Sequence, residues 1–227
     1  MRIKNEKELL ELFVEKVDPE REMLTRPFLN VKYPPQVWAT NRYLLLVVKK
    51  DCLTSEYPEG KLSMPNMEER NFYSVVTKQA LQNALGKCEQ VEEEVVTGKY
   101  EKCDECCGSG EVEWEYIDKH RSIHYEYHDC PVCNGTGHSE EPRRRKTGKM
   151  TADPESFVRI DAMAAKVSMV QIVVKAMELL GINEIYHYVN GNMKPNLFVI
   201  DNDIKLIWMG CACDDMELVK VETYESK

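Results

Sequence analysis

The chain has 227 residues, of which 43% are hydrophobic and 30% charged, and its formal net charge is −9. This composition predicts a folded protein rather than a disordered tail, and the negative charge disfavours non-specific nucleic-acid binding by the whole surface. No apolar run is long enough to predict a membrane span, and the N-terminus lacks the apolar segment of a signal peptide. The nine cysteines include two C-x-x-C pairs, a pattern typical of metal binding in a reducing compartment. We therefore expect a cytoplasmic protein with no membrane partner.

The first hundred residues predict an α+β arrangement. Apolar spacing indicates an amphipathic helix over 6–17. Strands are predicted at 26–33, at 36–51 with a turn at Thr40-Asn41, at 71–76 and at 89–96. Between them, 52–70 is rich in Pro, Gly, Glu and Ser and is expected to be a loop, and 77–88 is expected to be a short helix. Thr77 is a candidate cap for that helix and Gly86 a candidate stop.

The last third repeats this alternation. A strand is predicted at 156–161, followed by the clearest helix of the chain over 162–180, which Gly181 would close. Three further strands are predicted at 182–189, 195–201 and 203–213, with an Asp-Asn-Asp turn between the last two. Cys211 and Cys213 lie two apart on the last of these segments and are expected to be buried strand thiols. The fold class is therefore α+β.

Two copies of C-x-x-C-x-G-x-G, at 103–110 and 130–137, interrupt this material. Zinc prefers four soft ligands in a tetrahedron, and glycines after each pair let the backbone curl beneath a metal. The motif predicts one zinc site formed by Cys103, Cys106, Cys130 and Cys133. Four thiolates leave no open coordination position, so the site is expected to be structural.

The segments between the cysteine pairs alternate strictly between apolar and polar residues, which predicts a β-hairpin with a turn at 118–122. We expect one face of this hairpin to be aromatic and the other charged. The aromatic residues are either the packing surface of the hairpin or a platform on which bases stack. The candidate partner-binding residues are Trp114, Tyr116, Tyr125 and Tyr127. A module this small cannot build much core, so the metal is expected to supply its folding energy.

These cysteine repeats resemble the cysteine-rich domain of DnaJ-type co-chaperones. That domain has four such repeats and two zinc ions, so the resemblance implies a single zinc ion here. No His-Pro-Asp signature of a J-domain is present in the chain. What the resemblance implies is a zinc-ribbon scaffold that binds protein partners.

A basic strip follows the second cysteine pair. It consists of Arg143, Arg144, Arg145, Lys146 and Lys149. Two interpretations stay open: a solvated linker returning to the main domain, or a strip that contacts nucleic-acid phosphates.

The flanks of the cysteine region resemble bacterial DNA polymerase sliding clamps. The similarity lies in TRPFLNV (25–31), VWATNRYLLLVV (37–48), NFYSVVTKQAL (71–81), FVRIDAMAAKVSMVQIVVKAMELLG (157–181) and KPNLFVIDNDIKLIWMG (194–210). It implies two clamp-like repeats, in which a helix packs on an antiparallel sheet. The body would comprise 1–97 and 151–227, with 98–150 inserted as the zinc module. Two repeats are fewer than the three of a bacterial clamp, which leaves a homo-oligomer open.

No P-loop, G-x-S-x-G or dinucleotide motif is present, so we expect no catalytic residues and no enzymatic activity. The first functional hypothesis is a non-enzymatic, DNA-associated zinc protein in replication, repair or a mobile element. The clamp resemblance implies that helical lysines would face the DNA, and the candidates are Lys4, Lys7, Lys78, Lys87, Lys166 and Lys175. The alternative is a chaperone-like adaptor that binds proteins through the zinc module, with the clamp-like body as its scaffold.

Overall fold

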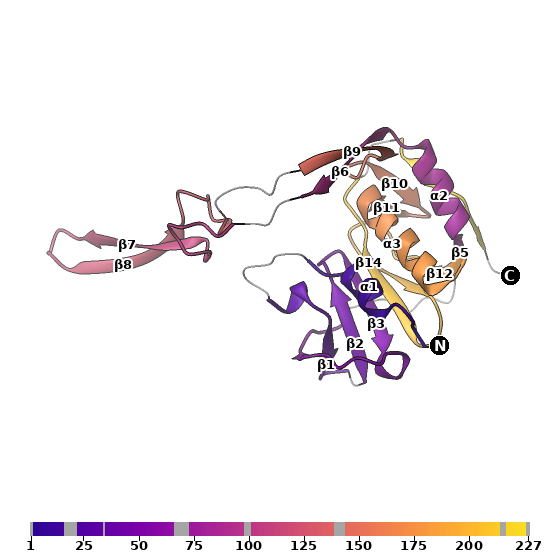
Figure 1. The fold of residues 1–227 in the computed structure, drawn as a ribbon, viewed down its shortest axis with the longest axis horizontal. Coiled ribbons are helices and arrows are strands. Elements are labelled where there is room, and N and C mark those ends of the chain that lie inside the picture. Colours follow the sequence, from indigo (N-terminus) through magenta and orange to yellow (C-terminus); the bar gives the residue numbers. More distant parts are fainter. Residues whose placement is uncertain are drawn as a thin grey trace. The chain divides into compact units, whose positions relative to one another are not determined.

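The computed structural model describes residues 2–15, 22–33, 35–65, 73–97, 101–138, 144–213 and 217–225. The chain divides into two compact units (Figure 1). One, which we call the body, contains Met1–Val91 and Thr151–Lys227, and the other, the cysteine module, contains Glu92–Met150. The module therefore begins a few residues before the boundary at 98 expected from the sequence, because the strand over 90–96 pairs with the strand that returns at 144–152.

A nine-stranded sheet forms most of the body, in the order β16-β5-β12-β13-β14-β3-β2-β1-β4. Its strands are β1 (Phe28–Asn30), β2 (Gln36–Thr40), β3 (Leu44–Lys49), β4 (Glu59–Gly60), β5 (Ser74–Thr77), β12 (Glu184–Tyr188), β13 (Pro195–Val199), β14 (Ile204–Met209) and β16 (Thr223–Glu225). All neighbours are antiparallel except β1 and β4. The hairpins β2–β3 and β13–β14 agree with the predicted strand pairs and turns.

Strands β3 and β14 join the N-terminal and C-terminal segments into one sheet, with Ile204 opposite Val48. The apolar run of β3 reflects burial on both faces. Leu44, Leu46 and Val48 pack in the main core, whereas Leu45 and Val47 pack in a second cluster with Phe28, Trp38 and Ile207. Side chains alternate across a strand, so a strand with both faces covered has no polar period.

A second sheet has three strands, β10 (Phe157–Ile160), β11 (Met163–Lys166) and β15 (Val219–Val221). The helix predicted from 162 is wrong at its start, because 163–166 is a strand paired with β10. Alanine favours helices, but Ala164 and Ala165 are buried and their backbone groups pair across the sheet, which overrides that weak preference. A turn at Asp161, whose φ is 51°, reverses the chain between the two strands.

In the part of the body that the structure describes, the α-helices are α1 (Glu6–Glu11), α2 (Lys78–Lys87) and α3 (Val167–Leu180). The first is shorter than the predicted 6–17. Thr77 caps α2 by accepting a hydrogen bond from the Ala80 N–H at 3.1 Å, as predicted. Gly86 is not the stop, because it lies inside α2. Gly181 closes α3 in the left-handed conformation at φ 67°, which confirms the prediction.

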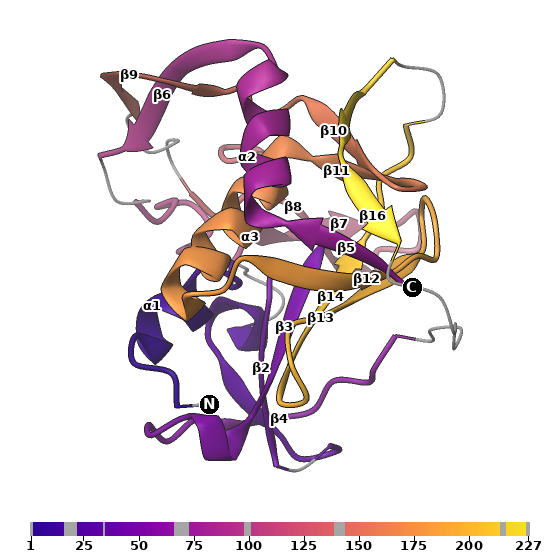
Figure 2. The same cartoon turned by 90° about the vertical axis from the view of Figure 1, so that its right-hand side faces the viewer.

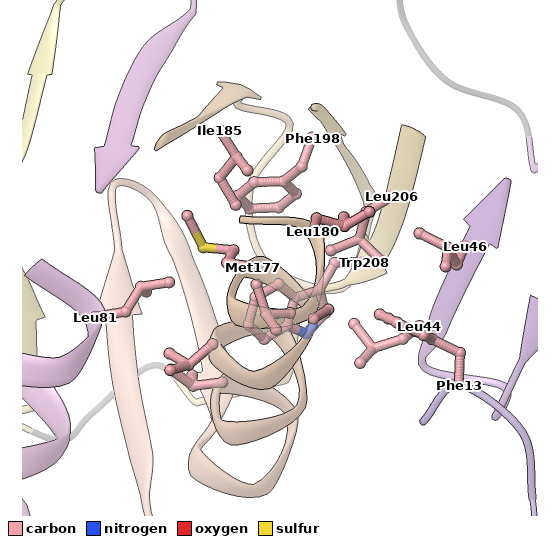
Figure 3. Close-up of a cluster of buried hydrophobic side chains, with 14 of the residues drawn as sticks. Phe13, Leu44, Leu46, Leu81, Met177, Leu180, Ile185, Phe198, Leu206 and Trp208 are labelled. Carbon is pink, nitrogen blue, oxygen red and sulfur yellow. The ribbon is translucent and has the colours of Figure 1, made fainter. Parts of the chain in front are cut away.

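The main core lies between the helices and the large sheet. Helices α2 and α3 pack against each other (Figure 2). Figure 3 shows Met177 and Leu180 of α3 among side chains of the sheet, including Phe198 and Trp208. The apolar side of α3 is therefore explained by burial.

The cysteine module has two short ribbons, β6 (Gln90–Val96) with β9 (Arg144–Ala152), and β7 (Glu111–Ile117) with β8 (Ile123–Asp129). The second pair forms the predicted hairpin (Figure 1). Its turn is organised by Asp118, whose carboxylate accepts hydrogen bonds from the N–H groups of His120 and Ser122. Helices long and apolar enough to cross a bilayer are absent from the parts of the chain that the structure describes.

Candidate metal centre

Four cysteine sulfurs converge at the base of the hairpin. The sulfurs of Cys103, Cys106, Cys130 and Cys133 all lie within 4.8 Å of one another, and all four residues are buried. The Cys103–Cys130 sulfurs are 3.9 Å apart and the Cys106–Cys133 sulfurs 3.7 Å apart. A disulfide would need about 2.05 Å. Four sulfurs around a zinc ion with Zn–S near 2.3 Å lie about 3.8 Å apart, so the donors and their spacing fit a tetrahedral metal site.

The two cysteine pairs lie in two turns of the same geometry, which we call knuckles. The Gly110 N–H donates to the Cys106 sulfur at 3.3 Å, and the Gly137 N–H donates to the Cys133 sulfur at 3.2 Å. Backbone bonds then cross from one knuckle to the other. The Cys103 N–H donates to the Gly137 carbonyl at 2.9 Å, and the Cys130 N–H to the Gly110 carbonyl at 2.8 Å. The two halves of the sequence repeat are therefore two halves of one approximately twofold site.

The last glycine of each repeat allows the knuckles to touch. A Cβ on Gly110 would lie 2.5 Å from the Gly135 carbonyl oxygen, and one on Gly137 would lie 2.6 Å from the Gly108 carbonyl oxygen. Both glycines also have φ values near +80°, a region that favours glycine. The glycines of the motif are thus required by close backbone approach as well as by turn geometry.

The same contacts set the acidity of the thiols. Burial opposes ionisation of Cys106, but N–H donors from Gly110 and Gly108 outweigh it and lower its pKa to about 6. Burial likewise opposes ionisation of Cys133, and the Gly137 N–H lowers the pKa of that thiol. The Cys106 N–H favours the thiolate of Cys103, yet burial and the neighbouring sulfurs raise its pKa to about 11.

The hairpin register corrects one prediction. Trp114 is opposite Glu126 and Tyr116 opposite His124, whereas Tyr125 and Tyr127 are opposite glutamates. Directly opposite residues of an antiparallel pair share a face, so the aromatic residues do not gather on one side. We call one side the histidine face; it consists of Val112, Trp114, Tyr116, His124, Glu126 and His128. The other is the acidic face; it consists of Glu111, Glu113, Glu115, Ile117, Ile123, Tyr125, Tyr127 and Asp129.

Side chains on the histidine face contact one another. The His128 ring lies 5.1 Å from the Trp114 ring, and its Nε2 is 3.3 Å from a Glu126 carboxylate oxygen. The His124 ring stacks on Tyr116 at 5.0 Å. The Asp118 carboxylate accepts N–H groups of Ser122 and His120 and contacts His124 Nε2 at 3.1 Å, and these contacts lower the pKa of Asp118.

The hairpin is exposed on both faces. The exposed fractions of its four large aromatic residues are 53% for Trp114, 49% for Tyr116, 58% for Tyr125 and 70% for Tyr127. Only Val112 packs against the cysteine cluster. Among the described residues, the aromatic side chains of the hairpin therefore form no buried core.

The basic strip lies mostly on β9. Arg143 lies outside the described residues, whereas Arg144, Arg145, Lys146 and Lys149 are exposed on the strand. Strand β9 pairs with β6, which carries three consecutive glutamates. Lys146 forms an ion pair with Glu92 at 3.6 Å, and Thr147 donates to Glu93 at 2.8 Å. Part of the charge of this strip is thus balanced within the ribbon.

Four of the lysines expected on helices contact carboxylates, although Lys166 is the last residue of β11 and not part of α3. The observed ion pairs are Lys7–Glu11, Lys87–Glu222, Lys166–Glu155 and Lys175–Glu8. Cys211 and Cys213 lie beyond the end of β14 and are half-buried, so the prediction that they are buried thiols of that strand is wrong. Cys211 forms an isolated β-bridge with Ala164. Burial raises the pKa of Cys211.

Comparison with known proteins gives similarity of structure only. No family model and no curated protein matches the chain. The structure is similar to the DNA polymerase sliding clamp of Pseudomonas aeruginosa, with 11% identity, a TM-score of 0.43, and coverage of 91% of this chain and 64% of the clamp. For Caulobacter crescentus pol III beta the identity is 9%, the TM-score 0.41 and the coverage 91% and 64%. For the Bacillus subtilis sliding clamp the identity is 13%, the TM-score 0.29, and the coverage 79% of this chain and 41% of the clamp.

The chain thus spans less than two thirds of the length of these clamps. They belong to the family that the flanking sequence segments resemble. A likeness this distant does not identify the chain as a clamp and assigns it no function.

Two features of the site were not predicted from the sequence. The first is that His124 and His128 each contact an aromatic ring and a carboxylate. The register of the two strands decides these contacts, and the sequence pattern within one strand does not indicate them. The second is the close approach of the glycines across the two knuckles. The repeated spacing of Gly110 and Gly137 was a signal for it, although only the pairing of the knuckles shows the contact.

Proposed function

We propose that the chain is a non-enzymatic zinc-binding adaptor, in which one structural Zn²⁺ holds the β7–β8 hairpin as a docking element for a protein partner. The observation that carries this proposal is the hairpin itself. It is a two-stranded sheet, exposed on both faces, that displays four large aromatic side chains above a four-cysteine site.

Zinc suits the cysteine site because it accepts four thiolates without a preferred distortion. All four ligands come from the protein, so no coordination position is left for water, and the ion would act in folding rather than in catalysis. An isolated two-stranded hairpin is at best marginally stable in water. The metal would therefore supply the free energy that the missing core cannot.

A partner protein suits the hairpin because Tyr and Trp are enriched where protein surfaces bind each other. The support is that four large aromatic side chains are exposed on one hairpin. Residues 101–138 contain nine acidic and three basic residues, a net charge of −6 before the metal is counted. That charge repels a phosphate backbone and leaves a polypeptide as the favoured partner.

The test is selection of binders from a displayed random peptide library. The zinc-loaded full chain would be compared with a variant in which 113–127 is replaced by Asn-Gly. Val112 and His128 are directly opposite, so a two-residue turn can close the shortened hairpin. We expect peptides that bind the full chain and not the variant. A selection whose binders all survive the replacement would overturn the proposal.

A second candidate function is association with DNA, favoured by the exposed Arg144, Arg145 and Lys149 on β9. The test is affinity for duplex DNA across a salt series. Binding that weakens steeply with salt, with a smaller slope in R144Q/R145Q, supports this function. Absence of binding at low salt contradicts it.

For the body, we propose two clamp-type repeats with the cysteine module inserted in the second. Support comes from the position of the module, Glu92–Met150, which lies between the strand–helix unit β5–α2 and the strand–helix unit β11–α3 of the body. A cytoplasmic location is part of the same proposal, because the nine cysteines are all free thiols and the metal site needs a reducing compartment.

A further inference from the structure

The acidic face pairs each of its tyrosines with a glutamate. Glu113 is directly opposite Tyr127, and Glu115 is directly opposite Tyr125. Directly opposite side chains have Cβ atoms about 5 Å apart, so each pair places a carboxylate beside an aromatic ring. Among the described residues, none of these four side chains forms a hydrogen bond, an ion pair or a ring contact.

The histidine face also has aromatic rings near carboxylates, but there an imidazole contacts both groups. His128 lies against Trp114 and reaches Glu126, and His124 lies against Tyr116 and reaches Asp118. Each imidazole thus contacts one aromatic ring and one carboxylate. The acidic face has two such pairs of an aromatic ring and a carboxylate, and neither pair is contacted by an imidazole or another nitrogen-containing side chain of the described residues.

A cationic side chain is the group that fits such a pair. A guanidinium or ammonium is attracted to the face of an aromatic ring and to a carboxylate, and arginine can do both at once because its planar group stacks. The two glutamate–tyrosine pairs are two residues apart along the strands, which corresponds to about 7 Å. In an extended peptide, side chains at alternate positions point the same way with the same spacing.

We propose that the acidic face binds an extended polypeptide segment that carries arginine or lysine at alternate positions. This proposal rests on the adaptor function and names the chemistry of its partner. Towards the turn, the face ends in the exposed pair Ile117 and Ile123. An apolar residue of the partner, two positions beyond the second basic residue, would contact that pair.

The probe is a fluorescent peptide of about twelve residues, with arginine and threonine alternating and a leucine at one end. One control peptide has the same composition but contiguous arginines. The other has glutamate in place of each arginine. Binding to the zinc-loaded full chain is measured by fluorescence anisotropy, at low salt and at physiological salt. The controls separate recognition of the spacing from attraction to a negatively charged surface.

Two matched double variants keep the strands intact, because threonine favours strands. Y125T/Y127T removes both rings of the acidic face, whereas W114T/Y116T removes both rings of the histidine face. Loss of two ring–cation contacts is expected to weaken binding of the alternating peptide roughly tenfold. W114T/Y116T is expected to change it less than about twofold. E113Q/E115Q is expected to weaken binding and to reduce its dependence on salt. Zinc stoichiometry and the amide resonances of Gly110 and Gly137 report that each variant is folded.

Three outcomes would overturn the proposal. The first is equal affinity for the alternating and contiguous peptides, and the second is equal binding of the alternating peptide by wild type and Y125T/Y127T. The third is that Y125T/Y127T loses binding only to duplex DNA or to a second copy of the chain. These outcomes are distinct from failure of the adaptor function. If library selection yields apolar peptides that depend on Trp114 and Tyr116, the hairpin is a docking element and the basic-segment proposal is wrong. If no peptide depends on the hairpin, both fail.

Discussion

His187 Nδ1 lies 2.7 Å from a carboxylate oxygen of Asp161, and the His187 side chain is fully buried. The other ring nitrogen of His187 faces Asn196 Oδ1 at 3.3 Å. That oxygen already accepts the N–H groups of Asn190 and Gly191, while the Asn196 amide nitrogen donates to carbonyls, so the orientation of the amide is fixed. The two ring nitrogens of His187 therefore face two oxygens, one from the Asp161 carboxylate and one from the Asn196 amide.

The first prediction concerns this pair. We expect H187A to destabilise the chain by about 1–3 kcal/mol, because it removes a hydrogen-bond partner from the half-buried Asp161 carboxylate. H124A, in an exposed part of the hairpin, is the control and is expected to change stability by less than about 1 kcal/mol. Chemical denaturation measures both. Equal effects of H187A and H124A would mean that the contact of His187 with Asp161 does not stabilise the fold.

The same pair predicts an acid response. Burial alone would raise the pKa of Asp161, but hydrogen bonds from His187, Ser74 and Thr223 outweigh it and lower the pKa below its ordinary value. A lowered pKa means that the ionised carboxylate stabilises the fold above the pKa of the unfolded chain, near 3.9, and that this contribution is lost as the pH falls through the folded pKa. D161N is expected to be less stable at neutral pH and to lose less stability below pH 4. Denaturation of both proteins across pH 2–7 tests this, and parallel curves would contradict it.

The second prediction concerns the metal. The full chain is expected to contain one zinc per molecule by elemental analysis, and C106S is expected to lose it. C107S is the matched control, because Cys107 is adjacent in sequence but exposed and outside the four-sulfur cluster. Chelation is expected to unfold residues 92–150 and leave the body folded, as judged by amide NMR. Melting of the whole chain on chelation would show that the module is not separable.

The third prediction concerns the knuckle glycines. G110A is expected to lower zinc affinity at least about tenfold, since its methyl group would clash with the Gly135 carbonyl oxygen and the left-handed backbone is strained as well. G148A is the control for strain, because Gly148 also has a positive φ but open space around it. A competition titration with a zinc indicator measures the affinities. Equal losses in both variants would mean that the close approach of the knuckles does not matter.

The fourth prediction concerns the anchoring of α1. The buried Glu6 carboxylate accepts hydrogen bonds from the N–H groups of Thr54 at 2.6 Å and Ser55 at 2.8 Å. Burial would raise the pKa of Glu6, but the hydrogen bonds from Ser55 and Thr54 lower it. We expect E6Q to cost about 1–3 kcal/mol of stability at neutral pH, because an amide cannot accept all of these bonds.

E8Q is the control for this substitution. Glu8 is on the same helix, but it is half-exposed and its ion pair with Lys175 spans 3.8 Å. Its loss is expected to cost at most about 1 kcal/mol. Urea denaturation of both variants measures the difference. Equal effects would mean that Glu6 does not anchor the helix.

The sequence by itself determined the local features of this protein. The two cysteine repeats identified the four sulfurs, the turn residues at 201–203 marked the β13–β14 hairpin, and Thr77 and Gly181 marked the ends of two helices. These features depend on neighbouring residues, whose backbone geometry and hydrogen bonds are set within a few positions along the chain.

The tertiary structure alone decided the relationships between distant segments. The pairing of β3 with β14, the strand at 163–166 in place of a helical turn, and the contact of His187 with Asp161 each depend on which backbone edges and side chains are buried together. The same holds within the hairpin. A one-residue change of register moves a strand's side chains to the opposite face, and alternation in each strand does not say which residues of the two strands share a face. The register therefore decides that the tyrosines of β8 lie with glutamates, and not with Trp114 and Tyr116.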